Sequence, residues 1–187
     1  MKKALHGIRS KPIKKPLILL LVTLFLFTSV SSALATRDVL SVPEYSQQPY
    51  DQICWATSAA MVVSFFLDDT TNRNVEIAQA EFGEDEFNQP SWNMEPYVED
   101  YTGESGSTQS NSLSYTAVQN QVNNDGPIIT VIYWSEGGSH AEVIKGYDTS
   151  TDFVLYNDPW DGLGHGATYS YYEDNDDWTW DWSLFWR

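Results

Sequence analysis

The single cysteine of the 187-residue chain occupies a position suited to nucleophilic chemistry. Cys54 begins a segment of helix-forming residues that runs to Leu67 and contains neither glycine nor proline. A cysteine in the first turn of a helix readily becomes a thiolate, because the unpaired backbone N–H groups and the helix dipole stabilise negative charge. One cysteine cannot form an internal disulfide, so the alternative for Cys54 is a buried, inert side chain. We predict that Cys54 is a nucleophile.

A cysteine nucleophile works with a histidine that takes up the thiol proton and later donates it to the leaving group. Two histidines follow Cys54 in the sequence, His140 and His165. His140 comes directly after the flexible segment Gly137–Ser139, which lets its side chain face a cleft. His165 lies between two glycines, in what we predict to be a solvated loop. We expect His140 to be the base and retain His165 as an alternative.

Two further groups would complete such a site. The imidazole needs an acceptor that fixes its tautomer and orientation. Asn157 and Asp158 end the strand after His140, and a hairpin would return them to its side. We predict that Asp158 orients the ring, with Asn157 as the alternative and an ordinary turn before proline as the simpler role for Asp158. The oxyanion of a tetrahedral intermediate needs donors, and Gln48, six residues before Cys54, is the predicted amide donor.

The elements that must position these residues change in character along the chain. The first half predicts helices at Cys54–Leu67, Asn74–Phe82, Asn93–Tyr101 and Ser114–Asn123. The second half, rich in β-branched and aromatic residues, predicts strands at Pro127–Trp134, His140–Tyr147, Phe153–Asn157, Thr168–Tyr172 and Trp178–Phe185. Asp51 is a candidate cap for the first helix, and Gly103–Ser112 reads as a loop. The fold class is therefore α+β, with two lobes and a cleft where they meet.

Three segments of the sequence resemble the active-site segments of papain-like cysteine peptidases. They are QPYDQICWA at residues 48–56, SHAEVIKGYD at residues 139–148 and VLYNDPWDG at residues 154–162. The spacings, 86 residues from Cys54 to His140 and 18 from His140 to Asp158, are similar to those of a short bacterial branch. That branch includes exported effector proteases of plant pathogens and lies near the double-glycine leader peptidases. Single segments of this kind are weak evidence, but several in the same order are strong.

The resemblance extends from Val42 to about Tyr172 and implies both a fold and a reaction. The implied fold is papain-like and two-lobed, with an N-terminal helical lobe that carries the cysteine helix and a C-terminal antiparallel β-sheet lobe. The implied reaction is hydrolysis of peptide bonds through a Cys-His-Asp triad and a thioester acyl-enzyme. Gln48 would complete the oxyanion hole, and Trp160 would shield the bond between the histidine and its partner from water. No cofactor or metal is expected.

The sequence also departs from the larger papain relatives. Gln52–Ile53 replaces the glycine-containing dipeptide that commonly precedes the nucleophile. Glu142 stands where those relatives usually carry a small apolar residue. Papain itself orients its histidine with an asparagine, which makes Asn157 the competing choice, whereas the Asp-Pro sequence at Asp158 fits the short bacterial branch.

The first 35 residues have the layout of a secretory signal peptide. Six of the ten basic residues lie there, followed by an apolar stretch at Leu17–Val30 and the small-residue sequence Ala33–Ala35. The apolar stretch is shorter than the roughly 20 residues of a membrane span. We predict cleavage after Ala35, which leaves a secreted peptidase domain at residues 36–187. An uncleaved membrane anchor is the alternative.

The predicted mature chain is strongly acidic. It keeps four basic residues against all 26 acidic ones, which gives a formal charge of −22. Such a charge argues against nucleic-acid binding and favours cationic ligands or substrates. We expect a monomer that acts on a protein or peptide substrate, binds no nucleic acid and does not stay associated with the membrane.

Two features near the C-terminus have simpler explanations than a binding site. Trp178, Trp180 and Trp182 alternate along a predicted strand and should share one face, where we expect them to pack on the core. The alternative is an exported recognition or adhesion module that binds through this strand. The acidic segment Glu173–Asp177 lacks the ligand spacing of an EF-hand, so we expect a solvated turn. A second enzymatic alternative is a Cys-His amidase of cell-wall peptides.

Overall fold

Seven strands form one antiparallel sheet in the computed structural model, which describes residues 35–187. The strands are β1 (Arg37–Val39), β2 (Ser107–Ser110), β3 (Ile128–Trp134), β4 (Ser139–Asp148), β5 (Phe153–Asp158), β6 (Leu163–Thr168) and β7 (Trp178–Phe185). Their order is β2-β7-β3-β4-β5-β6, with β1 paired to β4. The apolar residues of β3 are buried on both faces, so β3 and its neighbours form the centre of the sheet.

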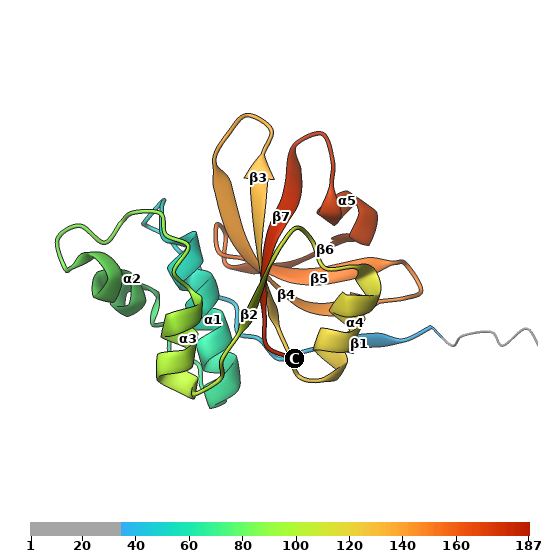
Figure 1. Cartoon of the computed structure of the whole chain (residues 1–187), viewed down its shortest axis with the longest axis horizontal. Helices are drawn as coiled ribbons and strands as arrows, with labels where there is room; N and C mark the ends of the chain where they lie inside the picture. Colours follow the sequence, from blue (N-terminus) through green and yellow to red (C-terminus); the bar gives the residue numbers. More distant parts are fainter. Residues whose placement is uncertain (1–34) are drawn as a thin grey trace, which may run out of the picture. The chain divides into compact units, whose positions relative to one another are not determined.

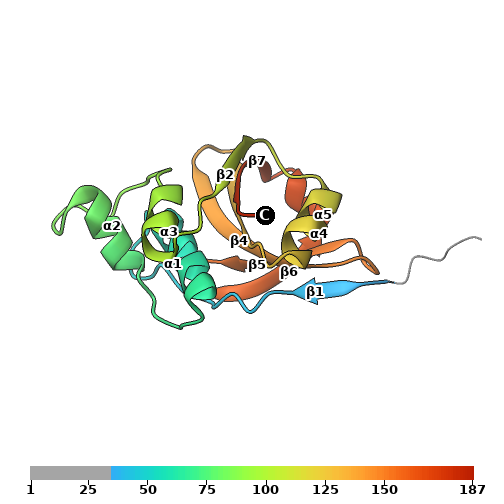
Figure 2. The ribbon, with the colours of Figure 1, turned by 60° about the horizontal axis from the view of Figure 1, so that its bottom comes forward.

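Five helices accompany the sheet in the described part of the chain. They are α1 (Cys54–Leu67), α2 (Asn74–Phe82), α3 (Glu95–Thr102), α4 (Tyr115–Asn123) and α5 (Tyr169–Glu173). Figure 1 shows α1, α2 and α3 grouped beside the sheet, while α4 and α5 lie with the strands, and Figure 2 shows the same grouping from another direction. The mixture of helices with an antiparallel sheet confirms the predicted α+β class with a helical and a sheet lobe.

Two buried clusters occupy opposite faces of the sheet. The first joins α1, α2 and α3 to β3 and β4 through residues such as Met61, Val131 and Val143. The second includes Ile132 and Tyr172 and lies under α4 and α5. Because side chains alternate along a strand, neighbouring residues of β3 contribute to different clusters. The sheet is thus covered on both sides, and α1 is packed directly against β4.

Helix α1 carries the cysteine and is the most deeply buried helix of the first lobe. Residues Trp55–Ser64 are all buried, which agrees with a sequence of small and apolar residues on every face. The helix ends at Asp68, whose left-handed φ of 52° lets its N–H return to the last turn. Its bounds match the prediction. The predicted cap does not: Ile53 holds the cap position without a side-chain bond, and Asp51 instead accepts a hydrogen bond from Asn88.

The prediction of a strand at Thr168–Tyr172 is wrong. Strand β6 ends at Thr168, and the chain then forms the short helix α5, which brings Tyr172 into the core. The predicted loop around His165 is wrong as well, because His165 lies on β6 opposite Tyr156 of β5. The glycine-containing sequence of β6 does not favour a strand by itself, but pairing with β5 supplies the backbone hydrogen bonds that stabilise one.

The tryptophans of β7 do not share one face. A β-bulge lies between Val131 and Ile132 of β3, so that Ile132 pairs with Trp180 and Val131 pairs with Trp182. Trp180 joins the cluster beneath α5, whereas Trp182 packs against the cluster beneath α1. A bulge inserts one residue and shifts the alternation, which explains the difference from the prediction. Both residues pack on the core, as expected.

The strand β2 lies within the segment predicted to be a loop, and pairs with β7 at the edge of the sheet. Within residues 35–187, no helix combines the length and the apolar character needed to cross a bilayer. The predicted signal peptide falls outside the described residues, except for Ala35.

Candidate active site

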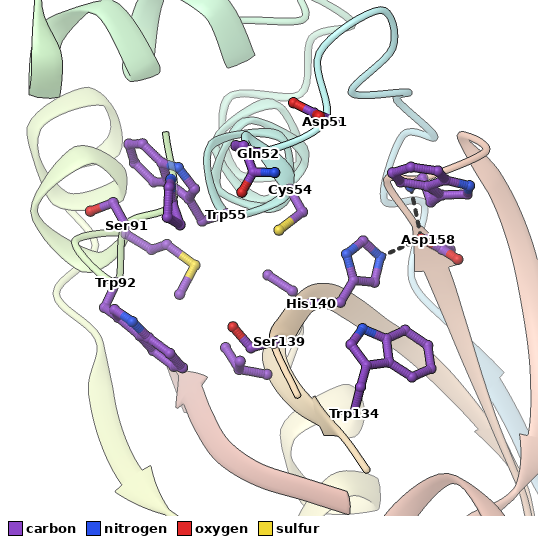
Figure 3. Close-up of a pocket in the computed structure, with 16 residues that line it drawn as sticks. Asp51, Gln52, Cys54, Trp55, Ser91, Trp92, Trp134, Ser139, His140 and Asp158 are labelled. Carbon is purple, nitrogen blue, oxygen red and sulfur yellow. Dashed lines mark hydrogen bonds and ion pairs between the residues drawn. The ribbon is translucent and has the colours of Figure 1, made fainter. Parts of the chain in front are cut away.

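Cys54 is the first residue of α1 and lines a pocket of about 670 Å³ (Figure 3). The side chain is partly exposed, so its sulfur is accessible. The first turn of α1 contains no acidic residue, and its free N–H groups face the N-terminal end of the helix. The local field at this position favours negative charge on a sulfur atom.

His140 and Asp158 come from neighbouring strands of the sheet lobe. His140 is the second residue of β4 and Asp158 is the last residue of β5. The turn before β4 contains Gly137 and Gly138 with φ of 99° and 92°, values that side-chain-bearing residues rarely adopt. The antiparallel pairing of β4 with β5 returns the chain to His140, and Nε2 of His140 lies 2.6 Å from Oδ1 of Asp158.

The imidazole of His140 lies between a sulfur and a carboxylate. Figure 3 shows the Cys54 side chain on one side of the ring and Asp158 on the other. Since Nε2 is bonded to Asp158, Nδ1 is the nitrogen left for the thiol. Asp158 is itself fixed, because its Oδ1 also accepts the backbone N–H of Trp160 at 2.8 Å.

The electrostatics of the site favour a protonated His140. Burial of the ring opposes its charged form, but the hydrogen bond to Asp158 and the influence of the nearby Cys54 outweigh burial and raise the pKa of His140 from 6.5 to about 10. Burial alone would raise the pKa of Asp158, yet the hydrogen bond from His140 and its positive charge hold that pKa below its usual range. Both shifts describe one ion pair, in which the carboxylate stabilises the imidazolium.

Asn157 points away from this ion pair. Its side chain is fully buried, and its Nδ2 donates to the carbonyl oxygens of Val42 and Pro43 at 3.2 and 3.1 Å. Neighbouring residues of a strand face opposite sides, so only one of Asn157 and Asp158 can reach the imidazole. In this structure Asp158 makes the contact and Asn157 ties the sheet to the segment that precedes α1.

Gln48 lies beside the pocket but not in its lining. Its Nε2 is 3.4 Å from the carbonyl oxygen of Trp160, a residue that does line the pocket. Gln52, two residues before Cys54, lines the pocket in its place. The structure thus brings Cys54, His140 and Asp158 together and leaves the Gln48 amide at the border of their pocket.

His165 lies outside the pocket lining, on β6. Its Nε2 is 3.0 Å from Oδ2 of Asp161, and both side chains are more than a third exposed. Ring and carboxylate atoms of His165, Asp161 and Asp158 lie within 4.8 Å of one another, as do those of His140, Glu142 and Asp158. In the second group only His140 and Asp158 are hydrogen-bonded to each other, and the carboxylate of Glu142 bonds to Tyr172 instead.

The pocket has aromatic walls, of which the sequence singled out only Trp160. Trp92, from the segment before α3, and Trp134, from the end of β3, line it together with Trp55 and Trp160. Trp92 stacks on Tyr133 with ring centroids 5.7 Å apart. No local pattern distinguishes these residues from core tryptophans, because the two lobes meet only in the folded chain. The walls give the site apolar surface for side chains of a bound peptide.

The comparisons with known proteins agree with this geometry. The sequence pattern of the family described as papain-like cysteine protease AvrRpt2 matches residues 36–177. No curated protein matches the chain in sequence.

Three solved structures resemble the chain at low sequence identity, and one of them has a TM-score above 0.5. A crystal structure described as a C39-like peptidase from Bacillus anthracis is 14% identical, with a TM-score of 0.55, and covers 81% of this chain and 98% of its own. Xylellain, a cysteine protease from Xylella fastidiosa, is 11% identical, with 79% and 85% coverage and a TM-score of 0.48. UfSP from C. elegans is 13% identical, with 81% and 34% coverage and a TM-score of 0.46.

The family match spans most of the described residues and includes Cys54, His140 and Asp158. The first of these solved structures supports the same two-lobed architecture at the level of the fold. The chain therefore belongs to the family of papain-like cysteine proteases that includes AvrRpt2, and it is a cysteine peptidase.

Proposed function

We propose that this peptidase hydrolyses peptide bonds with Cys54 as the nucleophile, His140 as the general acid and base, and Asp158 as the partner that orients the imidazole. The observation that carries the proposal is the 2.6 Å contact between His140 Nε2 and Asp158 Oδ1, with Cys54 on the other side of the same ring. This arrangement favours transfer of the thiol proton to Nδ1. The resting site is then a thiolate–imidazolium pair supported by a carboxylate.

Acylation begins when the Cys54 thiolate attacks the carbonyl carbon of the substrate. The carbonyl π electrons move to oxygen, and the oxyanion needs two donors. One is the backbone N–H of Cys54, which has no acceptor within the helix because it is the first residue of α1. The other is the side-chain amide of Gln48, whose position next to Trp160 keeps it at the edge of the pocket.

The intermediate then collapses to a thioester. The imidazolium of His140 gives its proton to the leaving nitrogen as the carbon–nitrogen bond breaks, and the amine product departs. A water molecule attacks the thioester while His140 takes its proton. The carbon–sulfur bond then breaks with its electron pair on sulfur, which releases the carboxylic acid and leaves the Cys54 thiolate beside the protonated His140, so the cycle closes without a cofactor.

Active-site labelling tests this assignment. An epoxide that alkylates activated cysteines, followed by peptide mapping, is expected to modify Cys54 in the native chain and not in a chain unfolded by denaturant. His140→Ala should abolish labelling at neutral pH, whereas His165→Ala serves as the matched control and should not. Equal labelling of all three proteins would contradict an activated thiol. Digestion of denatured protein in parallel with purified peptidoglycan separates peptidase from cell-wall amidase activity.

We also propose that the enzyme is exported and acts as a monomer. The charge and apolar pattern of residues 1–35 supports export. N-terminal sequencing of protein recovered from the medium should begin at Thr36, and intact chain retained in membranes would contradict cleavage. Size-exclusion chromatography with light scattering should give the mass of one mature chain.

A further inference from the structure

A second carboxyl group, that of Glu142, lies behind the ion pair of His140 and Asp158. Glu142 is two residues after His140 on β4, so both side chains project from the same face of the strand. Its side chain is buried, with 5% of the residue exposed. One carboxylate oxygen of Glu142, a ring nitrogen of His140 and a carboxylate oxygen of Asp158 all lie within 4.8 Å of one another. The imidazole therefore has two acidic neighbours.

Glu142 is held in place by a tyrosine from α5. The hydroxyl of Tyr172, on α5, donates to Oε2 of Glu142 at 2.7 Å. That hydroxyl is also 2.6 Å from Oγ1 of Thr130 on β3, and both groups are buried. Because an ionised carboxylate only accepts, the bonds run from Thr130 to Tyr172 and from Tyr172 to Glu142. These two hydrogen bonds fix the carboxylate beside the imidazole.

The environment of Glu142 makes its charge depend on pH near neutrality. Burial raises the pKa of Glu142 from 4.5 to about 7, against the opposing effects of the His140 charge and the Tyr172 bond. In return, a negative Glu142 helps to raise the pKa of His140. The titratable groups that face Glu142 from the surrounding elements are His140 of β4, Asp158 and Tyr156 of β5, His165 of β6 and Tyr172 of α5.

We propose that Glu142 is a positioning residue for His140: its carboxylate, held by Tyr172, acts with Asp158 as a second counter-charge to the imidazolium. This inference rests on the proposed role of His140. Asp158 fixes the ring through a direct bond, whereas Glu142 acts through space and through its ionisation. Ionised Glu142 keeps the proton on His140 at higher pH and so extends the pH range over which the thiolate–imidazolium pair persists.

Glu142→Gln separates this role from a purely structural one. The amide oxygen of glutamine still accepts from Tyr172, but the side chain stays neutral at every pH. Below about pH 7, where Glu142 itself carries a proton, kcat/KM of the variant should stay within about twofold of the parent. In the alkaline range the descending limb of the profile should move to lower pH by roughly one to two units, because a unit charge within 4.8 Å contributes about 0.6 pKa unit in water and about 2.5 units at an effective dielectric constant near 20.

A matched control removes a carboxylate from the same strand at a distance. Asp148, the last residue of β4, pairs with Arg37 at the far end of the strand. Asp148→Asn should leave both limbs of the profile in place. A uniform loss of activity at all pH values in Glu142→Gln would show a structural role and overturn the proposal. An unchanged profile in folded Glu142→Gln would overturn it as well.

A measurement on the unmodified chain keeps the proposal testable if Glu142→Gln fails to fold. The ring nitrogens of His140, followed by ¹⁵N NMR, should show a chemical-shift inflection near pH 7 that reports ionisation of Glu142. In Tyr172→Phe the same inflection should move to higher pH, since the hydroxyl that stabilises the carboxylate is gone. Absence of the inflection would overturn the proposal. NMR needs no turnover, so a failed peptidase assay would be a separate result.

Discussion

Asp158→Asn tests the central ion pair with the least change in shape. The asparagine carbonyl can still accept the N–H of Trp160, which Asp158 Oδ1 binds at 2.8 Å, so the turn after β5 should keep its conformation. The neutral amide cannot balance an imidazolium. The variant thus removes charge from a site whose backbone contacts are retained.

The size of the effect follows from the shift at His140. A rise in the pKa from 6.5 to about 10 corresponds to about 5 kcal/mol in favour of the imidazolium. The bond to Asp158 is the largest favourable contribution to that shift. Its loss should lower the pH at which His140 gives up its proton and reduce kcat/KM by roughly 10²- to 10⁴-fold near neutral pH. The free energy of unfolding should change little by comparison.

The neighbouring residue provides the matched control. Asn157→Ala removes a buried amide that donates to the carbonyls of Val42 and Pro43. Two buried acceptors lose their partner, so the free energy of unfolding should fall by about 2–4 kcal/mol, while the folded fraction keeps most of its kcat/KM.

The assay is kcat/KM on a fluorogenic peptide from pH 5 to 10 for each folded variant, together with denaturant unfolding. If Asn157→Ala abolished turnover in folded protein while Asp158→Asn stayed within tenfold of the parent, the assignment of Asp158 would be refuted. Such a result would place the orienting role on the asparagine, as in papain.

Five further substitutions probe the rest of the site. Cys54→Ser should abolish peptide hydrolysis while circular dichroism shows an unchanged fold, because a hydroxyl of similar size does not ionise between pH 5 and 10. An unfolded variant would indicate that Cys54 has a packing role. His140→Ala should lower kcat/KM as severely as Cys54→Ser, whereas His165→Ala should be mild, and the reverse order would reassign the base. Gln48→Ala should lower kcat by roughly 10²- to 10³-fold, and Gln52→Ala by much less, as measured by single-turnover kinetics. A larger loss in Gln52→Ala would assign the oxyanion donor to Gln52, which lines the pocket.

The elements that the sequence predicts well are those with strong local patterns. Helix α1 has the predicted bounds because small and apolar residues without glycine or proline favour a helix in any buried setting. Strand β7 also has the predicted bounds, since its aromatic residues fit a pleated sheet. The bulge that separates Trp180 from Trp182 is absent from the local pattern, because it depends on how β7 meets β3.

The misassigned elements depend on contacts with distant residues. The polar sequence of β2 has little tendency to form a strand, and its pairing with β7 supplies the missing hydrogen bonds. The aromatic sequence before Glu173 favours a strand by composition, yet it forms α5 and places Tyr172 in the core. In both cases the tertiary partner outweighs local preference.

The candidate site also has parts that the sequence predicts and parts that depend on distant residues. The order and spacing of Cys54, His140 and Asp158 can be predicted from the sequence because each lies near the start or at the end of a helix or strand that the local sequence predicts. The partner of Glu142 is not visible, since Tyr172 reaches it from a helix 30 residues further along the chain. The sequence marks Glu142 as unusual, and only the fold shows which groups surround it.

The effect of Glu142 on the stability of the fold gives a further argument that its carboxyl group serves the active site. A carboxyl group whose pKa is raised binds its proton more tightly in the folded chain, so it lowers stability as the pH rises from about 4.5 to 7. Above that range the ionised group costs about 3 kcal/mol relative to a group with an unshifted pKa. A small apolar residue, of the kind usual in the larger papain relatives, would avoid this cost. Because the ionised carboxylate faces the imidazolium of His140, the same charge that weakens the fold stabilises the proton on which the thiolate depends.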